Sequence, residues 1–121
     1  MKNDRVVCIV DDDEAVRDSI LVLLQAEGLA ACAFASAAEF LSDATALSAA
    51  CYILDVHMPG MDGVELLRHL RSNGVTVPIF LLTGRADPGL KRAALDAGAN
   101  AVLNKPTAEL VNLVVAALGQ M

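Results

Sequence analysis

The sequence predicts an α/β protein, in which a doubly wound, five-stranded parallel sheet of expected order 2-1-3-4-5 is flanked by five helices. Five short apolar segments alternate with longer amphipathic segments along the chain. Such regular alternation is typical of a parallel sheet with helices on both faces. Right-handed crossovers leave few topologies for it. The length of 121 residues fits one domain, which we expect to span residues 1–121.

The predicted strands are apolar and bounded by turn-forming residues, as buried parallel strands are. They cover residues 5–10, 29–34, 51–54, 77–82 and 101–104.

Each predicted helix has a recognisable start. Capping side chains, a proline at a first helical position and glycines after the last turn are the signals. The first helix is capped by Asp12 or Asp13, has an apolar stripe at Val16, Ile20, Leu23 and Leu24, and stops at Gly28. The second begins with a Ser36–Glu39 capping box, and the third covers residues 62–73. The fourth runs from Asp87-Pro88 to Gly98, and the fifth begins at Thr107.

Composition excludes several classes of protein. A formal net charge of −6 argues against direct binding of nucleic acid, which needs clustered basic side chains. No apolar run approaches membrane-span length, and the N-terminus lacks the apolar core of a signal peptide, so a soluble cytoplasmic protein without a membrane partner is expected. Cys8, Cys32 and Cys51 lie in apolar segments without metal-ligand spacing and are expected to be inert core thiols.

Polar side chains follow four of the five predicted strands. Asp11 and Asp12 follow the first and Asp55 follows the third, while Thr83 and Lys105 follow the fourth and fifth. Ligands of doubly wound sheets bind beyond the carboxyl ends of the strands, where the strand order reverses. The expected order therefore brings three carboxylates, a hydroxyl and an ammonium together.

Three carboxylates in one place need a hard cation. Mg²⁺ prefers oxygen ligands and keeps several waters, so a few carboxylates and a substrate phosphate suit it. A lysine can pair with further phosphate charge, and a carboxylate can act as nucleophile. The pattern predicts a magnesium-dependent phosphoryl site. Asp13 and Glu14 are expected to serve the first helical turn instead.

Four segments, "VDDDE", "YILDVHMPGMDG", "FLLTG" and "LNKP", resemble the receiver domain of two-component response regulators, whose fold is flavodoxin-like. The resemblance implies that Asp55 accepts phosphate from a histidine kinase or phosphotransfer protein. It also implies that Asp11, Asp12, Asp55 and the backbone carbonyl of His57 hold Mg²⁺. Thr83 and Lys105 match the switch hydroxyl and the phosphate-pairing lysine. The Lys105-Pro106 bond is cis in the family.

The chain departs from this family at Val102, where members usually carry an aromatic residue that turns inward with the threonine. Valine has a stiff χ1 and little volume to swing. Gly84 adds backbone freedom beside Thr83. The resemblance together with this departure predicts that phosphorylation is read through the segment from Thr83 to Pro88 and the fourth helix.

The fifth helix carries an apolar arc of roughly 200°, wider than one sheet contact needs. Val111 and Val115 lie at its far edge and are expected to stay exposed. An exposed apolar strip marks an interaction surface, so this face is expected to pair with a second copy or with an effector domain. Cover by Gln120 and Met121 is the alternative.

Two other functions remain open. The segment Asp11-Asp12-Asp13 also resembles the D-x-D core of haloacid-dehalogenase-type phosphatases, with Asp11 as nucleophile. That family needs an acidic pair after the lysine, and Glu109 is the only acid beyond Lys105. A scaffold without phosphorylation is disfavoured because all five site residues are present. No turnover of a separate substrate is expected.

Overall fold

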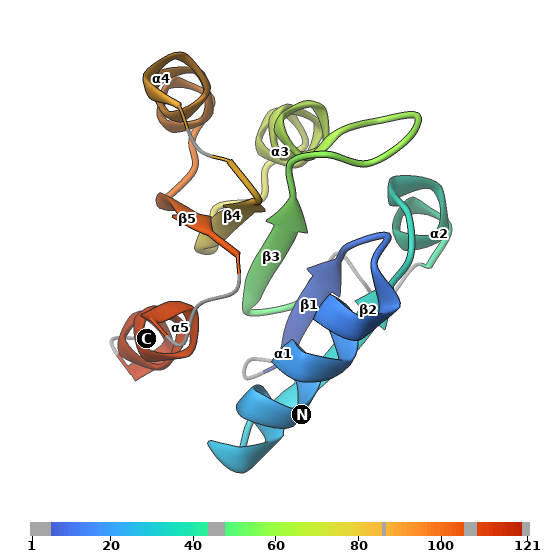
Figure 1. Cartoon of the computed structure of the whole chain (residues 1–121), viewed down its shortest axis with the longest axis vertical. Coiled ribbons are helices and arrows are strands. Elements are labelled where there is room, and N and C mark those ends of the chain that lie inside the picture. Colours follow the sequence, from blue (N-terminus) through green and yellow to red (C-terminus); the bar gives the residue numbers. More distant parts are fainter. Residues whose placement is uncertain (1–5, 44–47, 86, 106–108, 120–121) are drawn as a thin grey trace.

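A computed structural model describes residues 6–43, 48–85, 87–105 and 109–119. Within them the chain forms one parallel sheet of order β2-β1-β3-β4-β5, and strands alternate with helices along the sequence. Figure 1 shows α2, α3 and α4 on one side of this sheet and α1 and α5 on the other. The predicted fold class and strand order are confirmed.

The elements lie close to the predicted segments. In chain order they are β1 (Val6–Val10), α1 (Glu14–Ala26), β2 (Ala30–Phe34), α2 (Ala37–Leu41), β3 (Cys51–Asp55), α3 (Gly63–Ser72), β4 (Ile79–Thr83), α4 (Pro88–Asp96), β5 (Ala101–Asn104) and α5 (Glu109–Gly119). Asp55 and Thr83 therefore belong to the last positions of their strands.

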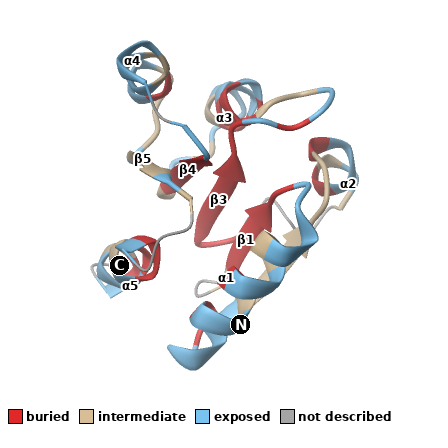
Figure 2. Cartoon of the chain, in the orientation of Figure 1, coloured by how far each residue is buried: buried red, intermediate tan, exposed pale blue. Residues whose placement is uncertain are grey.

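Two apolar cores cover the two faces of the sheet, because successive side chains of a strand point to opposite faces. Side chains of α2, α3 and α4, including Phe40, Leu67 and Ala94, pack on one face. Ile20 and Leu24 of α1 pack on the other with Leu110 and other residues of α5. The three inner strands are buried on both sides and form the centre of the molecule (Figure 2).

The helix starts follow the predicted capping chemistry. Asp13 caps α1, accepting hydrogen bonds from the amides of Ala15 and Val16. Asp62 and Glu65 form a reciprocal capping box at α3, and Asp87 caps α4 with Pro88 at its first position. These side chains satisfy backbone donors that a helix leaves unpaired.

Two local predictions are wrong in detail. The Ser36 side chain accepts from the Glu39 amide as expected, but the Glu39 carboxylate accepts from Ala35, one residue before the cap. Leu23, expected in the buried stripe of α1, is 41% exposed. The rotation of α1 is set by Ile20 and Leu24, which are buried against the sheet.

Several predictions concern residues outside the described ranges: Arg5 as the first strand residue, the isomer of the Lys105-Pro106 bond, Thr107 as a helix start, and cover of α5 by Gln120 and Met121. Among the helices of the described residues, none has the length and apolar character that crossing a membrane would require.

Candidate phosphoryl site

The carboxyl ends of four strands converge on one site. Asp11 directly follows β1, Asp55 ends β3, Thr83 ends β4, and Lys105 follows β5. Strands β1 and β3 are hydrogen-bonded neighbours, although β2 lies between them in the sequence. The site is thus at the predicted switch point of the strand order, where ligands of such sheets bind.

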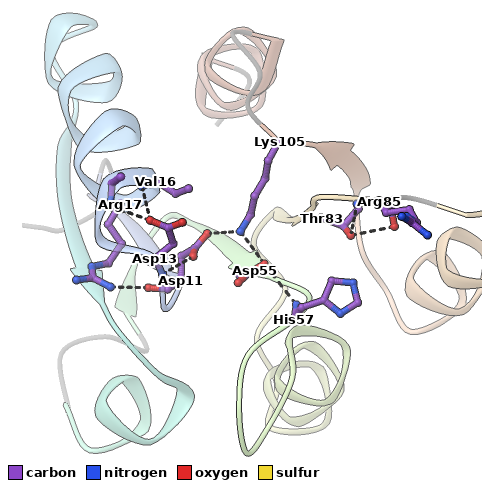
Figure 3. A network of polar contacts seen from close by, with 10 residues as sticks. Asp11, Asp13, Val16, Arg17, Asp55, His57, Thr83, Arg85 and Lys105 are labelled. Carbon is purple, nitrogen blue, oxygen red and sulfur yellow. Dashed lines mark hydrogen bonds and ion pairs between the residues drawn. The ribbon is translucent and has the colours of Figure 1, made fainter.

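Lys105 joins the two buried carboxylates. Its ammonium nitrogen Nζ lies 2.9 Å from Asp11 Oδ2 and 2.9 Å from Asp55 Oδ1. Figure 3 shows the lysine side chain reaching from the end of β5 to a point between the two acids. The amide of Lys105 donates to the carbonyl of Thr83 at 2.8 Å, which fixes the base of that side chain against β4.

Asp11, Asp12 and Asp55 offer carboxylate oxygens that all lie within 4.8 Å of one another. Asp11 and Asp55 are 1% and 3% exposed, whereas Asp12 is open to solvent. The buried Asp11 Oδ2 has the Lys105 ammonium as its partner at 2.9 Å. A set of carboxylate oxygens that includes two buried side chains fits a hard divalent cation such as Mg²⁺.

Backbone contacts hold the acids in place. The amide of Asp13 donates to Asp11 Oδ1 at 2.9 Å, and the amide of His57 donates to Asp55 Oδ1 at 3.3 Å. Arg17 Nη1 donates to the backbone carbonyl of Asp11 at 2.8 Å. Arg17 was not identified from the sequence, because its contact spans six residues between a loop and a helix and matches no local pattern.

The protonation of the site follows from its burial. Burial raises the pKa of Asp55 to about 6, with Asp11 adding to the increase, while Lys105 and the His57 amide oppose it. Burial by itself would lower the pKa of Lys105, but its pairing with Asp11 and Asp55 raises that pKa above the ordinary value. At neutral pH the site therefore contains an ammonium and a largely ionised Asp55.

Thr83 belongs to the same edge but contacts a different partner. Its side chain is fully buried, and its hydroxyl donates to the Arg85 carbonyl and accepts from the Arg85 amide, both at 3.1 Å. Figure 3 shows this pair apart from the three-residue cluster around Lys105. The hydroxyl is thus part of the β4–α4 connection in this structure.

The β3–α3 connection packs tightly against Asp55. A Cβ atom on Gly63, the first residue of α3, would overlap the backbone carbonyl of Asp55 and the Cα of Val56. The Gly63 amide donates to the Val56 carbonyl at 3.0 Å. Within this connection Met58 is buried and His57 is exposed.

The predicted switch and interface residues separate into two groups. Val102 is buried in the core on the α4 side of the sheet, Gly84 is exposed with open space around it, and Val115 is 39% exposed. The expected exposure of Val111 is wrong, because it is 6% exposed. Hydrophobic periodicity gives the width of an apolar arc, but the packed rotation of α5 decides which edge of the arc is covered.

A buried carboxylate at the switch point, two further acids and a lysine are groups that suit a phosphoryl group and a divalent cation. The family model for the response regulator receiver domain matches residues 7–116. The chain belongs to this family, whose domains are phosphoacceptor switches.

Individual relatives of the chain belong to the same family of response regulators. The chain is 40% identical over 116 residues to the transcriptional regulatory protein FixJ of Azorhizobium caulinodans, covering 94% of this chain and 55% of that protein. It is 41% identical over 102 residues to the C4-dicarboxylate transport regulator DctR of Rhodobacter capsulatus, covering 83% of this chain and 52% of that protein. The chain therefore spans about half the length of these relatives. Neither supports the phosphatase alternative.

Solved structures share the fold. The crystal structure of FixJ-N matches with a TM-score of 0.83 and 33% identity, covering 99% of this chain and 96% of that one. The chemotaxis protein CheY4 of Vibrio cholerae matches with a TM-score of 0.80 and 30% identity, covering 89% of this chain and 92% of that one.

Proposed function

We propose that Asp55 is the phosphoacceptor of this receiver domain, and that the domain at residues 1–121 works as a magnesium-dependent switch. The observation that carries the proposal is the position of Asp55: a buried carboxylate within 2.9 Å of a lysine ammonium and next to two further carboxylates. A carboxylate oxygen of Asp55 attacks the phosphorus of a donor. An acyl phosphate forms, and the bond from phosphorus to the donor's leaving group breaks.

Burial prepares Asp55 for this reaction. A pKa of about 6 leaves the carboxylate ionised at pH 7, and its desolvation raises its basicity above that of an ordinary aspartate. Its hydrogen bond from the His57 amide at 3.3 Å orients one oxygen.

Asp11, Asp12, Asp55 and the backbone carbonyl of His57 would hold Mg²⁺. When bound, the ion would neutralise charge on the acids and on the incoming phosphoryl oxygens, which would otherwise repel each other. Arg17 acts as a positioning residue, because its bond to the Asp11 carbonyl anchors the turn that carries both N-terminal acids.

Lys105 and Thr83 would recognise the product. Acyl phosphate formation replaces one carboxylate charge by about two negative charges with strong acceptor oxygens. The Lys105 ammonium is already within reach of Asp55. The Thr83 hydroxyl would exchange its partners on Arg85 for a phosphoryl oxygen, and this exchange would release the β4–α4 connection. With Val102 in place of an aromatic residue, that connection and α4 would carry the signal.

The proposed partners follow from the family and from the exposed apolar side chains on two helices. A histidine kinase or phosphotransfer protein would be the donor, which implies a cytoplasmic location. Leu95 on α4 and Val115 on α5 are 45% and 39% exposed on the two helices that flank β5. This α4-β5-α5 face would bind a second copy or an effector domain. Turnover of a separate substrate is not part of the proposal.

Phosphorylation by acetyl phosphate tests the assignment of Asp55. With Mg²⁺, the protein is expected to gain one phosphoryl group, and peptide mapping after borohydride reduction is expected to locate it at Asp55. Asp55→Asn should abolish the gain, and chelation of Mg²⁺ should strongly reduce it. Label on Asp11 would support the phosphatase alternative and overturn the proposal.

Substitution of Val115 tests the interaction surface. Val115→Glu is expected to reduce self-association or effector binding of the beryllofluoride-treated protein at least about tenfold, with the free energy of unfolding within about 0.5 kcal/mol of the parent. Val22→Glu on α1, where Val22 is 64% exposed, is the matched control. If size-exclusion chromatography showed equal association of wild type, Val115→Glu and Val22→Glu, Val115 would not belong to the interaction surface.

A further inference from the structure

Two cysteines lie side by side on neighbouring strands. Cys8 of β1 and Cys32 of β2 are register partners in a parallel pair. Both side chains belong to the core on the α2-α3-α4 face of the sheet. Their sulfur atoms are 2.8 Å apart, closer than two sulfur atoms in van der Waals contact. This pair was not predicted from the sequence, because 24 positions separate the two residues and no short motif links them.

The strand geometry is compatible with a covalent link. Adjacent strands lie about 4.8 Å apart, which is inside the range of roughly 4.4–6.8 Å between the Cα atoms of disulfide-linked cysteines. Closing the sulfur separation from 2.8 Å to the length of a disulfide bond requires an approach of only about 0.8 Å.

The two thiols differ in access and acidity. β2 is an edge strand and Cys32 is half-buried, whereas Cys8 is 1% exposed. The hydrogen bond between the two thiols lowers the pKa of Cys32 and raises that of Cys8, and burial adds to the increase at Cys8. Cys32 is therefore the thiol that an oxidant meets first, and Cys8 is placed to react with it next.

We propose that Cys8 and Cys32 form an oxidation site, at which a peroxide converts the thiol pair into a disulfide between β1 and β2. The Cys32 thiolate attacks a peroxide oxygen, the O–O bond breaks, and a sulfenic acid and one water form. The Cys8 sulfur then attacks the Cys32 sulfur, the S–O bond breaks, and a second water leaves. The two thiols lose two electrons and two protons, and hydrogen peroxide is reduced to two waters.

This link would tie the edge of the sheet to the strand that leads to the phosphoryl site. The amide of Asp11 donates to the carbonyl of Phe34 at 3.1 Å, so β2 already supports the position of Asp11. The oxidation chemistry itself needs neither Mg²⁺ nor phosphorylation. Its test therefore succeeds or fails independently of the function proposed for Asp55.

Peptide mapping of the peroxide-treated, folded protein tests the proposal. The full chain, dilute and reduced, is treated with hydrogen peroxide, alkylated and digested at glutamate and arginine. Cleavage after Glu14, Glu27, Glu39 and Glu65 puts the three cysteines on separate peptides. Before alkylation, the expected product is a monomer that is about 2 Da lighter than the reduced protein, because two hydrogen atoms are lost. The Cys8 and Cys32 peptides should be linked, and dithiothreitol should reverse the link.

Cys51 provides the matched control. It is buried on the opposite face of the sheet, in the core that α1 and α5 cover. Cys51→Ser is expected to form the same link at the same rate, and Cys32→Ser to form none. Recovery of Cys32 as an unlinked sulfinic acid, of links that involve Cys51, or of all three thiols unreacted in the folded protein would overturn the proposal. The wild-type peptide map distinguishes these outcomes even where a variant folds poorly.

Discussion

The two loops on either side of Asp55, the β3–α3 and β4–α4 connections, differ in how firmly they are held. At the start of α3 there is no room for even one carbon atom on Gly63, and Asp62 and Glu65 cap the helix reciprocally. At the end of β4, by contrast, Gly84 has open space around it. In α4, Ala94 is the buried residue, whereas α3 has five buried residues.

This difference separates two tasks. In the proposed function, the β3–α3 side would hold a nucleophile in a fixed position next to other charges, and close packing provides that rigidity. The β4–α4 side would respond, and the two hydrogen bonds between Thr83 and Arg85 would be exchanged in that response. Elements that move are drawn from the less stable parts of a protein. Three predictions test the contrast, from the largest expected effect to the smallest.

Gly63→Ala is expected to lower the free energy of unfolding by about 2–3 kcal/mol, because the added methyl group must displace the backbone of β3. Gly84→Ala is the matched control and should change it by less than about 0.5 kcal/mol, since the same atom meets open space there. Urea unfolding measures both. Similar effects at the two positions would contradict the contrast.

Asp55→Asn is expected to stabilise the metal-free protein by about 1–3 kcal/mol at pH 7. The carboxyl ionises near pH 3.8 in the unfolded chain and near pH 6 in the folded one. In the folded state the Asp55 carboxyl therefore keeps its proton up to a higher pH than in the unfolded chain. As a result, the free energy of unfolding falls as pH rises between these two values. The advantage of the variant should therefore be complete above pH 6 and vanish near pH 4.

Chemical unfolding at several pH values in a chelator measures this effect. Asp12→Asn removes an exposed carboxylate of the same cluster and should stabilise the protein less. If wild type and Asp55→Asn showed parallel stability curves over the whole range, burial of the Asp55 charge would not be costly.

Thr83→Ala is expected to have the smallest effect on the resting protein, about 1 kcal/mol, because it removes hydrogen bonds within one loop. Thr83→Ala should have a larger effect on how the β4–α4 connection responds to a phosphate mimic. With Mg²⁺ and beryllofluoride, amide exchange at Gly84, Arg85 and the first turn of α4 should change severalfold in wild type and little in the variant. Equal changes in both proteins would show that the loop does not act through this hydroxyl.

Local chemistry made much of the fold predictable. Alternation of apolar strands with capped helices indicated the class and order of the sheet, since each signal acts within a few residues. Asp62, Asp87 and Pro88 open their helices as expected. The polar residues that follow the strands could also be predicted to form one site, because all carboxyl ends of a parallel sheet meet at one edge.

Contacts between distant segments could not be predicted in this way. The burial of Val111 beside the exposure of Val115 depends on how α5 is rotated against the sheet, which periodicity leaves open. The Arg17 contact to the Asp11 carbonyl and the approach of Cys8 to Cys32 depend on distances between separate elements.

The sequence by itself determined the doubly wound sheet, the starts of α2, α3 and α4 and the family of the chain, because these follow from short-range patterns of polarity and from residues at fixed strand ends. The tertiary structure alone decided that Lys105 bridges Asp11 and Asp55, that Thr83 contacts Arg85, and that two thiols face each other across β1 and β2. The physical reason is that ion pairs and thiol contacts depend on differences of about an ångström between side chains, and only the packed core fixes those.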